Sequence, residues 1–452
     1  MENLVYSIRK KFNITQEDLA HILGVSFTSV NAWEGGKRAP QEHMRKVLSE
    51  ILSNDKLPSN TYMDHSIGLR RSDAGFVSSI LDYGGKRDAA PYTHKIGRWY
   101  GSLPSFLVSD LVRFVQTDMG RNGPLLANFS GSGTVALEAA INGMRSYGID
   151  VNPMAVLLGK LKTKKICYSY ENLMEAFELV IKNKLVTVPS LNVGNKNLIW
   201  NDNKWMSSEA RSAVKRICTG ISKIDNVDVQ IMLSVALGMI FMNFCNIDKR
   251  CTNHYVYKDN GDFDEQKFID TYRNEVINYY NAVCELNSID DFYTPNIKLG
   301  NVCELPFDNS SMDVVFSHPP YGTTINYYSI NRLPISILES ISFSEDVGIK
   351  DARCQKLDLS SGTLPRFNSF TEQWVNEAYR VLGNDGVFIS IIGDSRDKGN
   401  LSHPFTDIIA YGENAGFSLK EMFIWVTNHK SGMHVKRKGN HIDHNYVIIM
   451  QK

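Results

Sequence analysis

The sequence predicts an α/β protein with a Rossmann-like sheet and a helical insertion, preceded by a small all-α domain that contains a helix-turn-helix. Three observations predict this fold class. Two short amphipathic segments flank Gly24 near the amino terminus. A strand–glycine turn–helix–strand pattern spans residues 124–150. The apolar run Asp313–Ser317 ends in two prolines, which cannot continue a strand because each lacks an N–H group.

Composition describes an ordinary globular chain. Its 452 residues suffice for two or three domains, and 49 Lys and Arg balance 49 Asp and Glu, so a polyanion would have to be bound by local basic patches. No two of the seven cysteines form a CxxC pair, which argues against a zinc site and a disulfide framework. The amino terminus lacks a signal-peptide pattern, and the longest apolar stretch, Ile231–Phe244, is too short for a membrane span. We therefore expect a reduced, cytoplasmic protein without membrane or metal.

Residues 1–52 are predicted to form the small helical domain. Helices are expected over Gln16–Leu23 and Phe27–Glu34, with a tight turn at Gly24 and an end at Gly35. Two short helices joined by a glycine-containing turn form a helix-turn-helix, whose second helix enters the major groove of DNA.

The stretch Ile14–Glu34 resembles phage-repressor domains of the Cro/CI type. The resemblance implies phosphate contacts from Gln16 and Lys37, and base contacts from Thr28, Ser29 and Asn31. A helical protein-binding module that does not touch DNA is the alternative, and the local charge favours neither. Residues 53–90, polar and proline-containing at the start, are predicted to be a linker.

Residues 91–165 are predicted to be the cofactor-binding half of the sheet. Pro124–Phe129 has the pattern of a strand, and Val135–Asn142 that of the helix that follows it. Between them lie the glycines of Ser130–Thr134, and a second strand stops at Asp150. The glycines allow close approach of backbone to a ligand, the helix amino terminus attracts negative charge, and the Asp150 carboxylate can accept ribose hydroxyls. Taken alone, this GxGxxA pattern also fits an NAD-dependent dehydrogenase or a structural βαβ unit.

The most informative segment is His318-Pro319-Pro320-Tyr321. The two prolines force a rigid turn at the carboxyl end of a strand, where ligands of open α/β sheets bind. That turn would present a backbone carbonyl and the ring of Tyr321 to a planar amine. Lys298–Asn301 ends another strand upstream.

The loop Phe129–Thr134 and the Pro-Pro-Tyr turn together resemble DNA methyltransferases that act on adenine N6 or cytosine N4. The resemblance covers roughly residues 90–165 and 295–452 and implies S-adenosyl-L-methionine as cofactor. The residues expected to bind it are His94, Tyr100, Phe129, Ser130, Gly131, Ser132, Gly133, Thr134, Asp150, Val151, Asn301, Val302 and Ser317. For the Tyr92–Tyr100 segment, packing on the sheet edge is the alternative.

The resemblance also implies that His318, Pro319, Pro320 and Tyr321 are catalytic. The Pro319 carbonyl and the neutral His318 imidazole would accept hydrogen bonds from the amine of a flipped base, on which Tyr321 would stack. Activity should then fall as the pH falls through the pKa of His318. Methylation of cytosine C5 is excluded, since the chain has no Pro-Cys pair.

The chain departs from the family at two positions. Ala127 and Asn128 replace the usual Asp-Pro before the glycine loop, which removes an acidic partner for the cationic end of the cofactor. His318 replaces the usual Asp, Asn or Ser. A subgroup with His-Pro-Pro-Tyr followed by Tyr-Ser, as at Tyr328-Ser329, suggests that the enzyme is active.

Two segments are candidates for gripping DNA. Residues 166–290 are predicted to be a helical insertion that serves target recognition through Asp248–Lys258, with a structural cap over the cleft as the alternative. In the catalytic half, residues 291–452, helices are predicted over Thr371–Leu382 and Pro404–Ala415, a strand over Gly386–Ile392, and a final hairpin of Leu419–Val426 with Tyr446–Met450. The loop between the last two strands is expected to contact phosphates. Its basic residues are Lys430, Lys436, Arg437 and Lys438.

The leading hypothesis is therefore a site-specific DNA methyltransferase that acts on double-stranded DNA. It would serve restriction-modification or phage defence, with a restriction endonuclease as a conceivable partner. RNA amino-methylation and a transcription regulator with a non-catalytic methyltransferase domain are the alternatives. Adenine and cytosine are not distinguished.

Overall fold

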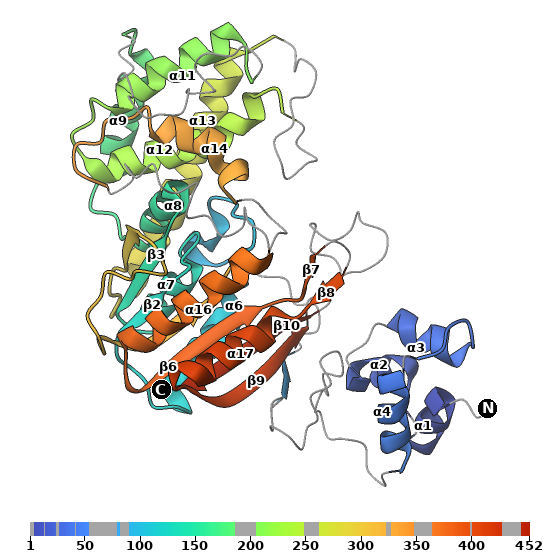
Figure 1. Cartoon of the computed structure of the whole chain (residues 1–452). Helices are drawn as coiled ribbons and strands as arrows, with labels where there is room; N and C mark the ends of the chain where they lie inside the picture. Colours follow the sequence, from blue (N-terminus) through green and yellow to red (C-terminus); the bar gives the residue numbers. More distant parts are fainter. Residues whose placement is uncertain are drawn as a thin grey trace. The chain divides into compact units, whose positions relative to one another are not determined.

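The structure is a computed structural model that divides the chain into two units, Met1–Arg87 with Ile389–Gln451 and Asp88–Phe388 with Lys452 (Figure 1). It describes residues 4–12, 14–23, 27–40, 42–53, 79–81, 90–185, 205–247, 262–321, 327–347, 364–397, 400–426 and 444–452.

The first unit begins with a four-helix bundle. Its helices are α1 (Leu4–Phe12), α2 (Gln16–Leu23), α3 (Phe27–Glu34) and α4 (Glu42–Ser53). The predicted bounds of α2 and α3 are confirmed, whereas Gly24 lies outside the described residues. The apolar positions of all four helices form one small core of Val5, Ile8, Leu19, Ala20, Leu23, Val30, Leu48 and Ile51.

The first unit also contains a strand layer. Strand β9 (Ser418–Val426) pairs antiparallel with β10 (His444–Gln451), which confirms the predicted final hairpin. Helix α17 (Pro404–Ala415) has its predicted bounds, with proline in its first turn and a left-handed Gly416 (φ +108°) at its end. Two short strands, β7 (Ser395–Asp397) and β8 (Asn400–Ser402), form a separate ladder.

The region expected to be a linker contains a strand. Residues Ser79–Leu81 form β1, which pairs parallel with β9. Three residues are too few to show a strand periodicity, so no local pattern announces this strand. Residues 79–81 of the predicted linker, 53–90, therefore form a strand of the sheet.

The second unit contains the parallel part of the sheet. Its strands are β2 (Leu125–Ala127), β3 (Ser146–Asp150), β4 (Asn296–Leu299), β5 (Met312–Ser317) and β6 (Leu382–Ile392). The strand order is β1-β9-β10-β6-β5-β2-β3-β4, and β6 runs through the boundary between the units. Strand β2 pairs parallel with β3 on one side and with β5 on the other. The chain order thus switches direction at β2, and a ligand crevice is expected at the carboxyl ends of these strands.

Helices of the second unit begin directly after strand ends. Helix α7 (Thr134–Ile141) follows the glycine loop, and α8 (Pro153–Thr163) starts at Asn152, whose Oδ1 accepts hydrogen bonds from the N–H groups of Met154 and Ala155. Helix α6 (Ser105–Thr117) precedes β2, after the short 3₁₀ helix η1 (Tyr92–Lys95). Helix α16 (Leu364–Val381) starts earlier than the predicted Thr371, and β6 starts at Leu382 rather than Gly386.

The described part of residues 166–290, the predicted insertion, is mainly helical. It contains α9 (Tyr170–Lys182), α11 (Ser208–Ile221), α12 (Val227–Phe241), η2 (Met242–Phe244), α13 (Glu265–Cys284) and η3 (Glu285–Ser288). Figure 1 shows these helices gathered with α14 (Tyr327–Leu338), which belongs to the catalytic half of the sequence. Leu333, Ile337 and Leu338 of α14 are buried in the core of the insertion, a contact that the sequence did not reveal.

Helix α12 is the buried centre of the insertion. The 18-residue window Val227–Phe244 is long and apolar enough to cross a membrane, which corrects the shorter length assigned from sequence. However, 67% of this window is buried inside the fold, where α12 packs against α8, α13 and α14. Its apolar surface is therefore explained by packing within the protein.

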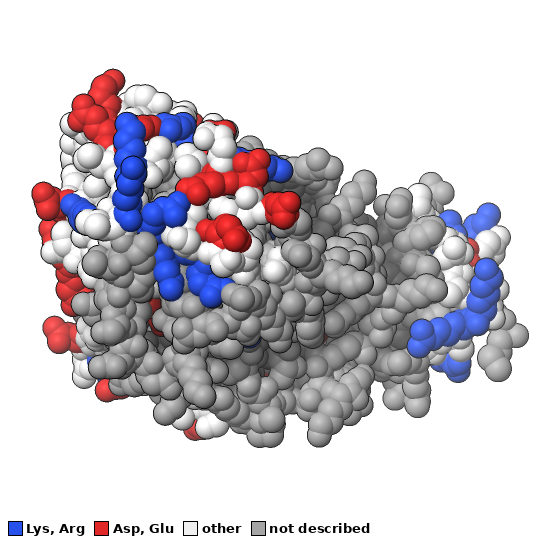
Figure 2. Space-filling view, turned by 90° about the horizontal axis from the view of Figure 1, so that it is seen from above, with Lys and Arg blue, Asp and Glu red and all other residues white. Residues whose placement is uncertain are grey.

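The described surface of the insertion carries both charges. Figure 2 looks down on this end of the second unit and shows Lys and Arg side chains interspersed with Asp and Glu. Described charged residues of the second unit form ion pairs such as Lys164–Asp228 (2.6 Å) and Arg273–Glu178 (2.7 Å). The predicted recognition segment, Asp248–Lys258, lies outside the described residues.

Candidate functional site

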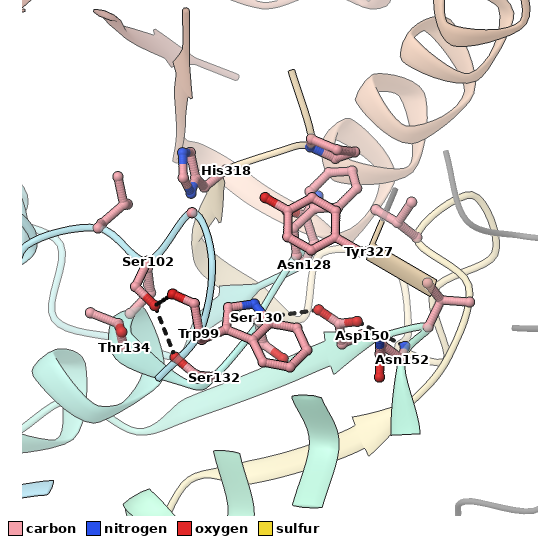
Figure 3. Close-up of a pocket in the computed structure, with 18 of the residues that line it drawn as sticks. Trp99, Ser102, Asn128, Ser130, Ser132, Thr134, Asp150, Asn152, His318 and Tyr327 are labelled. Carbon is pink, nitrogen blue, oxygen red and sulfur yellow. Dashed lines mark hydrogen bonds between the residues drawn. The ribbon is translucent and has the colours of Figure 1, made fainter. Parts of the chain in front are cut away.

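One pocket lies at the carboxyl ends of β2, β3, β4 and β5 (Figure 3). All of its lining residues belong to the second unit. They are Trp99, Tyr100, Gly101, Ser102, Leu103, Asn128, Phe129, Ser130, Gly131, Ser132, Thr134, Val135, Asp150, Val151, Asn152, Gly300, Asn301, Val302, His318, Pro320 and Tyr327. The glycine loop and the Pro-Pro turn, which are far apart in the sequence, therefore meet in one cavity.

The glycine loop and Asp150 hold one another in place. The Gly131 N–H donates to Asp150 Oδ2 and the Asn152 N–H donates to Oδ1, both at 2.8 Å. Gly131 has a φ of +48°, and a Cβ at this position would lie 3.2 Å from Trp99 Nε1. The carboxylate is thus held in a fixed orientation beside the glycine loop.

The Pro-Pro turn brings His318 and Pro320 to the opposite side of the pocket. His318 Nε2 lies 3.0 Å from the hydroxyl oxygen of Tyr321, and the two rings meet edge to face at 5.4 Å. Burial lowers the pKa of His318 to about 4 and raises the pKa of Tyr321 above its ordinary range. Both groups are therefore neutral at pH 7. Pro319 and Tyr321 are not among the residues that line the pocket.

A buried polar pair joins the tips of β2 and β5. Ala127 is aligned with Phe316, so the next residues, Asn128 and Ser317, lie side by side. Ser317 Oγ donates to Asn128 Oδ1 at 2.6 Å, and both residues are almost completely buried. Asn128 Nδ2 and Ser130 Oγ have no hydrogen-bond partner among the described residues, although both residues line the pocket. The sequence interpretation noted Asn128 only as a departure from the family, not as a site residue.

Two aromatic rings line the pocket: Trp99 belongs to the Tyr92–Tyr100 segment that was expected near the cofactor, whereas Tyr327 was not predicted as a site residue. Trp99 follows η1, and Tyr327 is the first residue of α14; their rings are nearly parallel, with centroids 6.4 Å apart and an interplanar angle of 17°. A Cβ on Gly101 would collide with the Tyr327 hydroxyl, so the small residue allows the ring to enter. Ser102 Oγ lies 3.3 Å from Ser132 Oγ and links this segment to the glycine loop. In the sequence, the one signal for Trp99 was its position directly before Tyr100, a predicted cofactor residue.

Most predicted cofactor residues line the pocket, but three do not. His94 Nε2 lies instead 2.6 Å from Glu138 Oε1, with the side chains only 4% and 5% exposed, and this pair ties η1 to α7. Gly133 and Ser317 are not among the lining residues either. Tyr100, Val151, Asn301 and Val302 line the pocket.

The structure describes some of the residues that were predicted to contact DNA. Gln16 Nε2 donates to Glu34 Oε2 at 2.7 Å, and Glu34 also pairs with Arg9. Asn31 and Lys37 are exposed, and Ser29 is half-buried. The side chain of Thr28 and the basic residues Lys430, Lys436, Arg437 and Lys438 lie outside the described residues.

Comparison with known proteins gives two family matches. Residues 5–54 match a helix-turn-helix family, and residues 312–452, which include the Pro-Pro turn, match a family described as DNA methylase. These matches confirm the assignment of an amino-terminal helix-turn-helix and a carboxyl-terminal DNA methylase domain.

The individual proteins that resemble this chain have low sequence identity to it. The Type II methyltransferase M.MvaI of Kocuria varians is 24% identical over 267 residues, which cover 55% of this chain and 58% of that protein. A putative DNA modification methylase of Thermus thermophilus, solved with S-adenosyl-L-methionine, is 18% identical with a TM-score of 0.21 and covers 34% of this chain and 51% of its own. An S-adenosylmethionine-dependent methyltransferase of Methanosarcina mazei is 11% identical with a TM-score of 0.29, and covers 74% and 92%.

Proposed function

We propose that the chain is an S-adenosyl-L-methionine-dependent DNA methyltransferase that methylates the exocyclic amine of adenine (N6) or cytosine (N4). One observation carries the proposal. His318 and Pro320 of the Pro-Pro turn line the same pocket as Gly131 and Asp150 of the cofactor loop. Methyl transfer requires the donor and the acceptor to lie together, and this pocket offers a place for each.

The lining residues fit the cofactor. The Asp150 carboxylate, held beside the glycine loop, would accept hydrogen bonds from ribose hydroxyls. The rings of Trp99 and Tyr327 supply apolar faces. When bound, the cofactor supplies a methyl group activated by a sulfonium.

The residues of the Pro-Pro turn would prepare the amine. Its lone pair is delocalised into the base, and acceptors for its N–H groups turn that lone pair toward the methyl group. The Pro319 carbonyl is one acceptor. His318 can be the other if its Nε2–H donates to the Tyr321 oxygen, because Nδ1 then keeps its lone pair. Tyr321 would thus fix the tautomer of His318, in addition to the stacking role inferred from sequence.

The biological setting is part of the proposal. We infer that the amino-terminal bundle binds double-stranded DNA, either at the methylation site or at an operator, and that the enzyme serves restriction-modification or phage defence in the cytoplasm with a cognate endonuclease. The match of residues 5–54 to a helix-turn-helix family and the exposed Asn31 and Lys37 of α3 and the turn after it support DNA binding.

Labelled cofactor tests the proposal. The full chain is incubated with S-adenosyl-L-methionine carrying a labelled methyl group and with duplex DNA, tRNA or no nucleic acid. Label in duplex DNA, recovered as N6-methyladenine or N4-methylcytosine by mass spectrometry of nucleosides, is expected. Label in tRNA alone would favour an RNA methyltransferase, and cofactor binding without transfer would favour a regulator; either result would overturn the proposal.

A further inference from the structure

A second cavity, of about 390 Å³, lies at the far end of helix α8 from the pocket that Asp150 and His318 line. Asn152, directly before α8, lines that first pocket, whereas Lys160 and Leu161 in the last turn of α8 line the second cavity. The two sets of lining residues have no member in common. Sites for small molecules in proteins typically measure about 300 to 1,000 Å³, so the second cavity is large enough for a ligand of its own.

The walls of the second cavity come from α8, α12 and β4, all in the second unit. Helix α8 packs against α12 and against the strands β3 and β4, and Figure 1 shows it between the insertion and β3. Apolar side chains from these elements form much of the lining; they include Leu161, Val227, Ile231, Met232 and Ile297. An apolar or aromatic group placed there would be removed from water, which is favourable.

Charged side chains also line the cavity, and most of them are accounted for. The Lys164 ammonium pairs with the Asp228 carboxylate at 2.6 Å, so these two charges offset one another. Lys165 Nζ donates at 2.6 Å to the carbonyl of Ile289, which is not a lining residue. Lys160 is the remaining cation of the lining.

Lys160 forms no ion pair with a described residue. The side chain is half-buried, and its Nζ donates to the Val347 carbonyl at 3.1 Å. A carbonyl has no formal charge, and an ammonium group has three N–H donors. Burial lowers the pKa of Lys160, and the exposed Asp346 offsets this effect only in part. A buried charge without a counter-charge is unfavourable, so an anion in the cavity would stabilise this ammonium.

We propose that the second cavity is a binding site for a small amphiphilic anion, whose acidic group pairs with Lys160 and whose apolar body lies against α12 and β4. The Tyr168 hydroxyl is a further donor among the lining residues, because it donates at 3.6 Å to Met232 Sδ, a weak acceptor. The inference does not rest on the proposed methyltransferase function, since the site is separate from the first pocket.

Two fluorescent probes that differ only in the acidic group test the inference. Anilinonaphthalene sulfonate carries a sulfonate on an aromatic body, and phenylnaphthylamine is the same body without the sulfonate. Each is titrated into the full chain, and binding is followed by fluorescence. Lys160→Met should raise the Kd of the sulfonate probe by about 10-fold or more, the size of a charge-assisted hydrogen bond, and change the Kd of the neutral probe by less than about 2-fold.

Two further variants serve as controls. Lys182→Met removes an exposed lysine of α9 that does not line the cavity, and it should leave both Kd values unchanged. Val227→Trp enlarges a side chain of the apolar wall and should weaken both probes. Circular dichroism checks that each variant is folded.

Three results would overturn the inference. The first is a Lys160→Met variant that binds the sulfonate probe as tightly as the wild type, or that weakens both probes equally. The second is wild-type affinity of Val227→Trp for both probes. The third is displacement of the sulfonate probe by S-adenosyl-L-homocysteine, because the probe would then lie in the first pocket. Methylation of DNA, measured separately, tests the proposed function and is independent of all three.

Discussion

The low pKa of His318 makes a quantitative prediction about stability. Burial lowers this pKa from its ordinary 6.5 to about 4, so the folded protein disfavours the imidazolium. In the pH range between these two values the unfolded chain binds more protons than the folded one, and stability falls as the pH falls. For a group with these two pKa values, lowering the pH from 7 to 5 costs about 2 kcal/mol of unfolding free energy. Above pH 7 the contribution is absent, since both states are neutral.

Urea denaturation of the wild type and of His318→Asn at pH 7 and pH 5 measures the contribution of His318 to the pH dependence of the unfolding free energy. Asparagine is neutral at both pH values, so the wild type should lose about 2 kcal/mol more than the variant between them. The interval from pH 7 to pH 8 is the internal control, in which the two proteins should change alike. Equal losses in the acid interval would show that His318 titrates near its ordinary pKa and would refute the reasoning.

The same shift changes the expected activity profile. If His318 had the ordinary pKa of histidine, a rate that depends on its neutral form would decrease at pH values below about 6.5. With a pKa of about 4, His318 remains neutral well below that value, and its contribution to kcat/KM should stay constant down to about pH 5.

Three further outcomes follow from the contacts. Tyr321→Phe removes the hydroxyl beside His318 Nε2 and should lower kcat by about 10²-fold, as measured by methylation kinetics. The Kd for the cofactor, measured by calorimetry, should stay constant. An unchanged kcat would exclude a role of Tyr321 in fixing the tautomer of His318. Asp150→Asn should raise the Kd for the cofactor by at least about 10-fold, because one of its two backbone N–H groups would face an amide N–H instead of a carboxylate oxygen, and an unaltered Kd would count against its role. Lys37→Ala should reduce the slope of log K against log salt for duplex DNA by about one in fluorescence anisotropy, and an identical slope would remove Lys37 from the phosphate contacts.

Local sequence signals were sufficient to predict the bounds of elements that begin and end at recognisable residues. Helix α17 lies between Pro404 and Gly416, and α2 and α3 are bounded by short polar and glycine segments, so their limits could be predicted. The glycine loop and Asp150 were predictable for the same reason, because strand, turn and helix follow one another within about 30 residues.

Features that depend on distant partners were not predictable. Strand β1 exists because of its pairing with β9, more than 300 residues away in the chain, and three residues carry too little periodicity to announce it. Helix α14 packs into the insertion although the sequence places it after the Pro-Pro turn. Tyr327 likewise reaches the pocket through tertiary packing, where its ring stacks near Trp99 of the Tyr92–Tyr100 segment, and no sequence pattern marked it as a site residue.

The Asn128–Ser317 pair shows why the site needs both kinds of information. The two residues are 189 positions apart, and each alone is an ordinary polar residue at the end of an apolar strand. Only the parallel pairing of β2 with β5 sets them side by side, where the Ser317 hydroxyl donates to the oxygen of the Asn128 amide. Since β2 is the point at which the strand order switches direction, the same pairing also brings the cofactor loop beside the Pro-Pro turn. If the register of β2 against β5 shifted by one residue, the cofactor loop would therefore be displaced from the Pro-Pro turn. The same shift would also separate Asn128 from Ser317.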